Sequence, residues 1–261
     1  MELLEPPTDA VAAAAAGIYH LHDADYVEAL RTGVDQYLAE SQGFDWCSGI
    51  WTMAVHTTAG VIAATDAALD DGVAGSLSSG LHHARPEQGA GFCTVNGLAV
   101  AAARLVADDL QVVVLDLDAH CGGGTAAMIA HHDLTDSVRQ FDLSTNIFDG
   151  YDHVGPHDRL VVVRRGDDDY IVAVAGMLDE IDWAGTDIVL YNAGVDIHPG
   201  FSRLTVTVRE RMVFERAAAE QTPIAWVLAG GYTAGITMEQ LVDVHWQTID
   251  AAATNHRKAT T

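Results

Sequence analysis

The sequence predicts one α/β domain spanning residues 1–261, a three-layer α/β/α arrangement with a mostly parallel sheet between two layers of helices. Three observations support this fold class. Short, β-branched apolar runs alternate along the chain with helical patterns. No repeat and no linker rich in Pro or Ser divides the chain, and hydrophobic residues make up 49% of it, enough for a large core. The alternation implies parallel strands joined by right-handed crossovers.

The predicted strands are short and apolar, and polar residues bound each of them, as expected of strands with both faces covered. They lie at Gln111–Leu117, Ser137–Leu143, Arg159–Val163, Asp187–Tyr191 and Ile224–Leu228. The accompanying helical patterns occur at Val95–Ala107, Gly123–Ala130, Asp168–Ile181 and Val206–Gln221. Ligands of such sheets bind beyond the carboxyl ends of the strands, so the residues that follow each strand are the candidates for function.

The charge balance is strongly acidic, with 37 Asp and Glu residues against 13 Lys and Arg residues and a formal net charge of −24. Such a surface repels phosphates, which argues against direct binding to nucleic acid or to an anionic membrane. The acid excess can attract cationic substrates, or it can keep the protein soluble in concentrated salt. Its spread along the entire chain favours salt adaptation or a general role in solubility.

Nothing in the sequence predicts insertion into a membrane or export. Every apolar stretch is interrupted by a charged or strongly polar residue before it reaches about 18 residues. The Ala-rich run at residues 10–16 lacks the basic region of a signal peptide. Three cysteines, an odd number, are widely spaced, so reduced thiols are expected. We therefore predict a cytoplasmic protein.

Polar side chains that suit a metal follow two of the predicted strands. Asp116, Asp118 and His120 alternate at the end of one apolar strand, so their side chains share a face. Buried carboxylates need a partner or a metal, although a solvated strand end would explain the same residues. Asp196 follows the next apolar strand, where an Asp is often only a turn former. Asp118, His120 and Asp196 together make a three-ligand set with open positions, typical of catalytic zinc.

Two further motifs are weaker when taken alone. His82 and His83 are adjacent, and such a pair can be ligands, bases or plain surface residues. Tyr232 follows Gly230 and Gly231, whose lack of side chains lets the backbone approach a ligand closely, although a packing tyrosine is the commoner explanation. A second pair, His131 and His132, lies at a predicted helix end, where histidine is favourable toward the helix dipole, so no functional role is assigned to it.

Five segments resemble the histone deacetylase superfamily, which includes the acetylpolyamine amidohydrolases. They are LHDADYVEAL (21–30), LHHARPEQGAGFCTVNGLAVAA (81–102), VVVLDLDAHCGGGT (112–125), VLYNAGVDIHPG (189–200) and VLAGGYT (227–233). Their order and spacing agree with the family over about residues 20–250. The resemblance implies the arginase–deacetylase type of fold and a zinc-dependent amidohydrolase that removes an acyl group, such as acetyl, from an amine.

The resemblance also implies roles for single residues. Asp118, His120 and Asp196 would bind Zn²⁺, and His82 and His83 would flank the water that zinc binds. Zinc lowers the pKa of water, and a histidine can take its proton and later deliver one to the leaving amine.

The remaining roles concern the two histidines and the substrate. Asp116 would accept a hydrogen bond from His82, and Tyr232 would donate one to the substrate carbonyl oxygen. Asp45 would be the rim carboxylate that holds the substrate backbone. The walls of the acyl-lysine tunnel would be Gly91 and Phe92, with Tyr151 opposite.

The sequence departs from the family pattern at three places. A polar residue, Asn or Asp, commonly stands where this chain has Gly123, so the side chain expected to orient His83 is missing. Asp142 falls where the family often has Ser near a structural monovalent cation, so K⁺ or Na⁺ is a candidate second ion. The resemblance does not include the family's N-terminal strand, so we expect an N-terminally shortened sheet whose edge a second copy could cover, as a homo-oligomer.

Acetyl-lysine peptides, acetylated polyamines and small N-acetyl metabolites all fit as the acylated amine. Two rivals remain open. One is a manganese ureohydrolase of the arginase type, on the same fold. The other is a catalytically impaired, metal-bound relative that acts as a binding protein, an alternative motivated by Gly123.

Overall fold

The computed structural model describes residues 3–152 and 157–259, and a parallel sheet runs through the middle of the molecule. The described strands form one six-stranded sheet in the order β1-β6-β5-β2-β3-β4, with every neighbouring pair parallel. The strands are β1 (Val73–Ser76), β2 (Val112–Asp116), β3 (Val138–Ser144), β4 (Asp158–Val162), β5 (Ile188–Ala193) and β6 (Ile224–Leu228). The predicted three-layer α/β/α class is confirmed.

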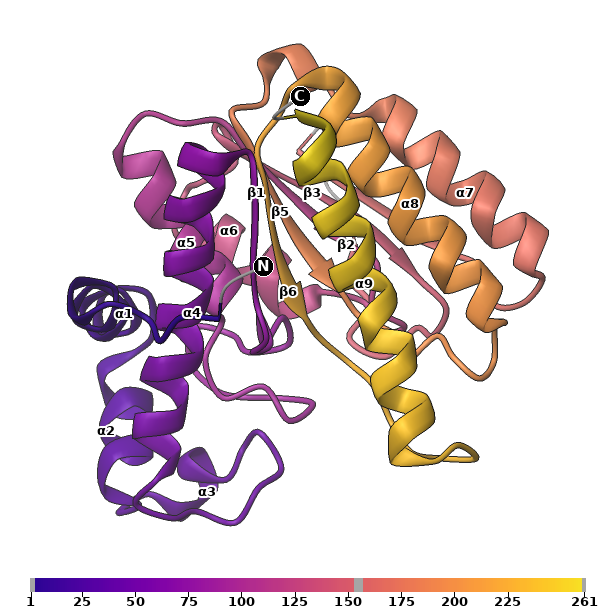
Figure 1. The fold of residues 1–261 in the computed structure, drawn as a ribbon. Helices are drawn as coiled ribbons and strands as arrows, with labels where there is room; N and C mark the ends of the chain where they lie inside the picture. The colour runs from indigo at the N-terminus through magenta and orange to yellow at the C-terminus, as the bar shows by residue number, and fades with distance from the viewer. Residues whose placement is uncertain (1–2, 153–156, 260–261) are drawn as a thin grey trace.

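Helices cover both faces of the sheet (Figure 1). One side carries α1 (Thr8–Leu21), α4 (Ile50–Asp71), α5 (Gly97–Ala107) and α6 (Gly123–His131), with α2 (Ala24–Thr32) and α3 (Gln36–Ala39) beyond them. The other side carries α7 (Asp167–Glu180), α8 (Arg203–Glu220) and α9 (Met238–Ala259). A short 3₁₀ turn, Trp183–Gly185, precedes β5.

The alternation of side chains along each strand divides the interior into two cores. In β2, Val112 and Val114 join the core beneath α1, α4 and α5, whereas Val113 and Leu115 join the core beneath α7, α8 and α9. Asp116 continues the series of Val112 and Val114. The period of two therefore turns its carboxylate to the side of the sheet that carries α5 and α6.

The two edges of the sheet differ from what the sequence suggests. The run Arg159–Val163 is predicted as a buried strand, but the observed β4 is half-buried along its whole length. The strand itself is confirmed, but its predicted burial is wrong, because β4 is an edge strand that pairs only with β3 among the described strands. At the other edge, β1 has only four residues and includes Gly75, so it lacks the β-branched pattern that reveals a strand.

The described chain before β1 is helical, and residues 3–72 contain no strand. Coverage of the β1 edge by a second copy of the chain stays a prediction. Among the described residues, none of the helices combines the length and the apolar character needed to cross a membrane.

Candidate metal centre

A row of buried polar side chains ends three neighbouring strands. Asn192, Asp116 and Asp142 are partners in the register of β5, β2 and β3, and all three are fully buried. Asn192 Nδ2 donates to Asp116 Oδ1 at 2.9 Å. His82 Nδ1 lies 2.7 Å from Asp116 Oδ2 and donates to it. Asp116 therefore holds one imidazole at the carboxyl end of the sheet, the role that the resemblance implies for it.

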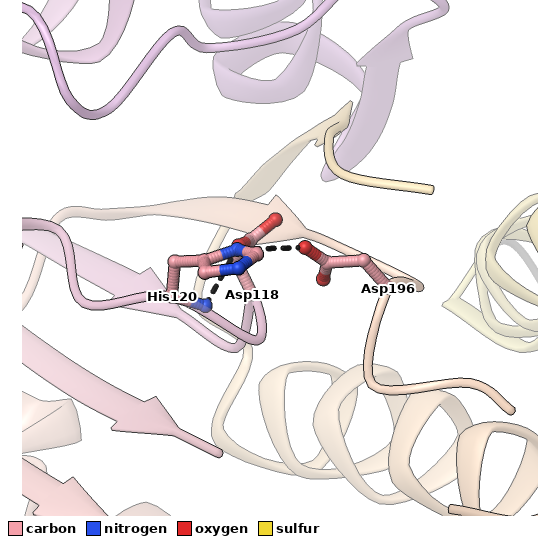
Figure 2. Close-up of side chains that lie close together, drawn as sticks. All are labelled: Asp118, His120 and Asp196. Carbon is pink, nitrogen blue, oxygen red and sulfur yellow. Dashed lines mark hydrogen bonds and ion pairs between the residues drawn. The ribbon is translucent and has the colours of Figure 1, made fainter. Parts of the chain in front are cut away.

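The loops that follow β2 and β5 bring Asp118, His120 and Asp196 together (Figure 2). One donor atom from each residue lies within 4.8 Å of the others. His120 Nδ1 is 3.3 Å from Asp118 Oδ1 and 3.0 Å from Asp196 Oδ2. Backbone amides fix both carboxylates, because Gly230 N donates to Asp118 Oδ2 at 3.0 Å and Ala119 N donates to Asp196 Oδ1 at 2.8 Å.

The surroundings of this cluster suit a small cation. Asp196 Oδ2 is buried and accepts no hydrogen bond of ordinary geometry from the described residues, although His120 Nδ1 lies beside it. A Cβ atom at Gly230 would lie 2.4 Å from Asp196 Oδ2, and one at Gly194 would lie 2.2 Å from Asp118 Oδ2. Glycine thus keeps both carboxylates reachable. One imidazole and two carboxylates with open positions are a donor set that zinc accepts at catalytic sites.

The charges of the cluster favour a cation as well. Interactions with the carboxylates of Asp118 and Asp196 raise the pKa of His120 to about 9. Burial and the Asp118 carboxylate raise the pKa of Asp196 to about 6. Burial also acts to raise the pKa of Asp118, but the neighbouring His82 and His120 outweigh it and leave that pKa low. Without a metal, the two carboxylates compete for one imidazolium, so a divalent cation would relieve their repulsion.

Within residues 3–152 and 157–259, this is the one place where at least three His, Cys, Asp or Glu side chains could hold a metal together. A ureohydrolase of the arginase type needs a second manganese ion and the additional carboxylates that hold it. The described residues supply one three-residue group, so the geometry gives that rival no support.

Two histidines lie next to the cluster, and a carboxylate holds each of them at Nδ1. The rings of His82 and His83 have their centroids 3.9 Å apart. His82 Nε2 is 3.7 Å from Asp118 Oδ1. Burial acts to lower the pKa of His82, but Asp116 and Asp118 outweigh it and raise that pKa to about 10. Burial lowers the pKa of His83 despite a hydrogen bond to Asp149.

Aromatic rings surround the entrance to the cluster. Phe148 stands edge-on to His83, with 5.0 Å between centroids, and to His120, with 5.9 Å. Phe92 is 53% exposed and has a left-handed backbone (φ 64°), and Tyr232 is 48% exposed, with its ring 6.5 Å from that of His120. A Cβ at Gly91 would lie 2.5 Å from His83, so the chain passes directly over that imidazole.

Two predicted substrate residues lie elsewhere. The Tyr151 hydroxyl is buried and has no hydrogen-bond partner among the described residues. Burial, followed by the charges of Asp142 and Asp116, raises the pKa of Tyr151, which places the hydroxyl near the row of strand-end carboxylates. Asp45 is exposed in the loop between α3 and α4, next to Phe44, whose ring packs on Phe92 at 5.2 Å. A tunnel role for Tyr151 and a rim role for Asp45 stay predictions.

Sequence reasoning did not single out Phe148 or Asp149, and the structure places both at the site. A signal was present, because both residues follow the carboxyl end of β3, the position where ligands of parallel sheets bind. Arg85, two residues after His83, was also passed over. Its guanidinium pairs with the Asp149 carboxylate.

Comparison with known proteins matches most of the chain to the family that the sequence motifs resemble. The family model of the histone deacetylase domain matches residues 3–249. An uncharacterised protein of Picosynechococcus sp. is 32% identical over 228 residues, which cover 83% of this chain and 75% of that protein. Histone deacetylase 2 of Arabidopsis thaliana is 30% identical over 196 residues, which cover 66% of this chain and 48% of that protein.

A solved structure shows the same fold. The crystal structure of an acetylpolyamine aminohydrolase from Burkholderia pseudomallei aligns with a TM-score of 0.69 at 19% identity, over 96% of this chain and 92% of that one. The family match includes every strand of the sheet and every residue of the metal cluster. With its sheet, its strand-end carboxylates and this match in agreement, the chain belongs to the histone deacetylase family.

Proposed function

We propose that the protein is a zinc-dependent amidohydrolase that removes an acyl group, such as acetyl, from an amine. The observation that carries the proposal is the buried cluster of Asp118, His120 and Asp196 beside two histidines held by carboxylates. Membership of the histone deacetylase family supports a hydrolase of this class. Asp118, His120 and Asp196 would hold the metal.

Two histidines would transfer the protons of the reaction, and a tyrosine would stabilise the negative charge that develops on the carbonyl oxygen. When bound, zinc polarises the amide carbonyl and makes the attacking water more acidic. His83 accepts a proton from that water as the new C–O bond forms, and His82 gives a proton to the amine nitrogen as the C–N bond breaks. Tyr232, at the mouth of the site, donates a hydrogen bond to the carbonyl oxygen as negative charge develops on it.

The partners of the two histidines support this division. Asp116 is shared between His82 and the neutral amide of Asn192, so its full charge favours the imidazolium form of His82. Asp149 is shared between His83 and the Arg85 guanidinium, which offsets its charge. His83 is therefore the better proton acceptor and His82 the better donor.

The aromatic residues near the site and the charge of the whole chain support the choice of substrate class. Phe148 presents its apolar ring to His83, and the exposed Phe92 directly follows Gly91, which lies against the same histidine. Apolar rings in these positions suit the methylene chain of an acylated amine. The net charge of −24 attracts a substrate with further cationic groups. Of the named relatives, one is a histone deacetylase and one an acetylpolyamine aminohydrolase, so an acetyl-lysine peptide and an N-acetylated polyamine are the first substrates to test.

The test is hydrolysis of these two substrates by metal-depleted protein, with and without added zinc, at low and high salt. We expect turnover that needs zinc and that is lost in Asp196→Asn, because this variant withdraws a charged ligand. Asp70→Asn, on the exposed end of α4, is the matched control and should behave as the wild type. Zinc bound at one equivalent without turnover of any acylated amine would overturn the proposal.

Tyr232→Phe separates an enzyme from a binding protein that merely retains the metal. We expect kcat to fall by about 10²- to 10³-fold with zinc content unchanged, because one oxyanion donor is removed. Tyr19→Phe, which changes a half-exposed tyrosine on α1, controls for the loss of a tyrosine hydroxyl. Equal rates in both variants would remove Tyr232 from the mechanism.

A further inference from the structure

Asp149 lies in the loop after β3, and both oxygens of its carboxylate have hydrogen-bond partners beside the histidine pair. Its Oδ2 lies 2.9 Å from His83 Nδ1 and accepts the Gly124 amide at 3.0 Å. Its Oδ1 accepts from the Arg85 guanidinium at 2.5 Å. The side chain is 7% exposed. Three donors, two from the segment of His83 and Arg85 and one from the start of α6, thus converge on one buried carboxylate.

The loop that carries Asp149 is tied to the metal-bearing segment. Asn146 N donates to Ala119 O at 2.7 Å, and Cys121 N donates to Phe148 O at 3.0 Å. Asp149 has a left-handed backbone (φ 57°), which Asp and Asn tolerate better than most residues. Its carboxylate reaches the first turn of α6, where the helix dipole and free amides favour an anion.

Position 123 explains why this loop residue is needed. The family commonly has a polar side chain there to orient the second histidine, and this chain has glycine. A Cβ atom at Gly123 would lie 2.2 Å from the Asp149 carbonyl oxygen and 2.8 Å from Asp149 Oδ1. The loop therefore fills the space into which a side chain at position 123 would project.

We infer that Asp149 is the positioning residue of His83, supplying from the loop after β3 the carboxylate that position 123 lacks. The inference rests on the proposed function for its catalytic meaning. Because the carboxylate accepts at Nδ1, His83 carries its proton there and keeps the Nε2 lone pair for the water proton. Arg85 holds the second carboxylate oxygen, so Asp149 can turn neither away from the ring nor toward solvent.

The first arm of the test compares steady-state kinetics of Asp149→Ala and Asp149→Asn with the wild type, on whichever acylated amine the wild type hydrolyses. We expect kcat to fall by about 10- to 100-fold in Asp149→Ala with KM nearly unchanged, since the loss is one of ligand orientation rather than of substrate contact. Asp149→Asn keeps an acceptor oxygen and tolerates the left-handed backbone, so it should recover part of the loss.

Asp133→Ala is the matched control, because Asp133 is exposed, lies at the far end of α6 and has nearly the same left-handed backbone (φ 54°). It should keep the wild-type kcat. A kcat in Asp149→Ala equal to that of Asp133→Ala would overturn the inference, and so would an equal loss in Asp149→Asn and Asp149→Ala accompanied by a raised KM.

The second arm needs no activity and so separates this inference from the proposed function. Nitrogen-15 NMR of the histidine side chains in metal-free protein reports which ring nitrogen of His83 bears the proton. We expect the Nδ1–H form in the wild type and in Asp149→Asn, and a mixture of tautomers in Asp149→Ala. A wild type that hydrolyses nothing refutes the proposed function alone, whereas an unchanged Nδ1–H signal in Asp149→Ala refutes the role of Asp149.

Discussion

At the scale of single residues, glycines at two positions leave room around the carboxylates of the candidate metal cluster. Gly194 lies against the Asp118 carboxylate, and Gly230 lies against the Asp196 carboxylate. A side chain at either glycine would collide with the neighbouring carboxylate. The amide of Gly230 also donates to Asp118, so this glycine both makes room for the ligand and orients it. Gly230 is thus explained by a close approach of backbone to carboxylate, whereas Gly231 is packed against His245, Leu241 and Val195.

Gly230→Ala should therefore weaken metal binding by at least about tenfold, because the new methyl group would push both carboxylates out of place. Zinc affinity measured by competition with a chelator checks this expectation. Gly176→Ala, on α7 where a Cβ would meet nothing within 4 Å, is the control and should bind zinc as the wild type does. Unchanged zinc affinity in Gly230→Ala would show that the loop can move to accommodate the methyl group, and would contradict this expectation.

His22 is a buried histidine that the fold requires in its neutral form. Its Nδ1 donates to Arg85 O at 2.9 Å, while its Nε2 accepts from Asn96 N at 3.1 Å. Burial lowers the pKa of His22 from 6.5 to about 4. The ring joins the end of α1 to the segment that carries His82 and His83, so it supports the site from behind.

The pH dependence of stability should show this histidine. Between pH 6.5 and 4 the unfolded chain binds a proton at His22 that the folded chain does not, so stability falls as the pH falls through this window. The full effect is about 3 kcal/mol at pH 4. Unfolding free energies from urea titrations at several pH values, wild type minus His22→Gln, check it. A difference independent of pH would contradict the assignment.

How far the sequence predicts this site depends on whether a residue belongs to a local pattern. Asp118 and His120 are two residues apart on one extended segment, so their common direction follows from the period of a strand. Asp149 contacts His83 from 66 positions away, through a loop that has no regular period. Only the missing side chain at Gly123 hints that such a partner exists, and the sequence does not say where.

At the scale of elements, a buried arginine on α8 donates hydrogen bonds to the ends of two strands of the sheet. Arg209 and Glu210 form an ion pair with both side chains fully buried. Arg209 Nη1 donates to Leu117 O at 2.8 Å and to Gly194 O at 2.7 Å, the carbonyls just beyond β2 and β5. One guanidinium therefore joins the two strand ends that precede the proposed metal ligands.

Arg209→Leu should destabilise the fold by about 3–5 kcal/mol, because it leaves Glu210 buried without its partner. The double variant Arg209→Leu/Glu210→Leu should recover part of this loss. Chemical denaturation of both variants measures the coupling, with Arg211→Leu, on the exposed face of the same helix, as the control that costs less than about 1 kcal/mol. Equal stability of the single and double variants would argue against a coupled pair.

The sequence predicts central elements better than edges for a physical reason. β2, β5 and β6 are covered on both faces, so their apolar runs are continuous and stand out. The four-residue β1 pairs with β6 and carries no such run, so its pattern is lost among turn residues.

At the scale of the whole molecule, the net charge of −24 is the dominant feature. Like charges repel one another more strongly in the compact state than in the extended chain, so the fold loses stability at low ionic strength. Salt shortens the reach of this repulsion, with a Debye length of about 10 Å at 0.1 M and about 3 Å at 1 M.

We expect the midpoint of thermal unfolding to rise between 0.05 M and 1 M NaCl, and calorimetry at neutral pH checks it. Near the isoelectric pH of about 4.5, where the net charge vanishes, the same salt series should give a much smaller rise. A midpoint that is flat or falls with salt at neutral pH would show that paired charges, rather than net repulsion, control the stability.

The exchange of a carboxylate between position 123 and the loop after β3 also constrains how such a site can evolve. An Asp introduced at Gly123 while the loop is in place would collide with the Asp149 backbone, and loss of Asp149 while Gly123 remains would leave His83 without its partner. We expect either single step to lower activity, although both end states hold the second histidine. Positions 123 and 149 should therefore show sign epistasis, so that lineages with the two arrangements are separated by a barrier that single substitutions do not cross.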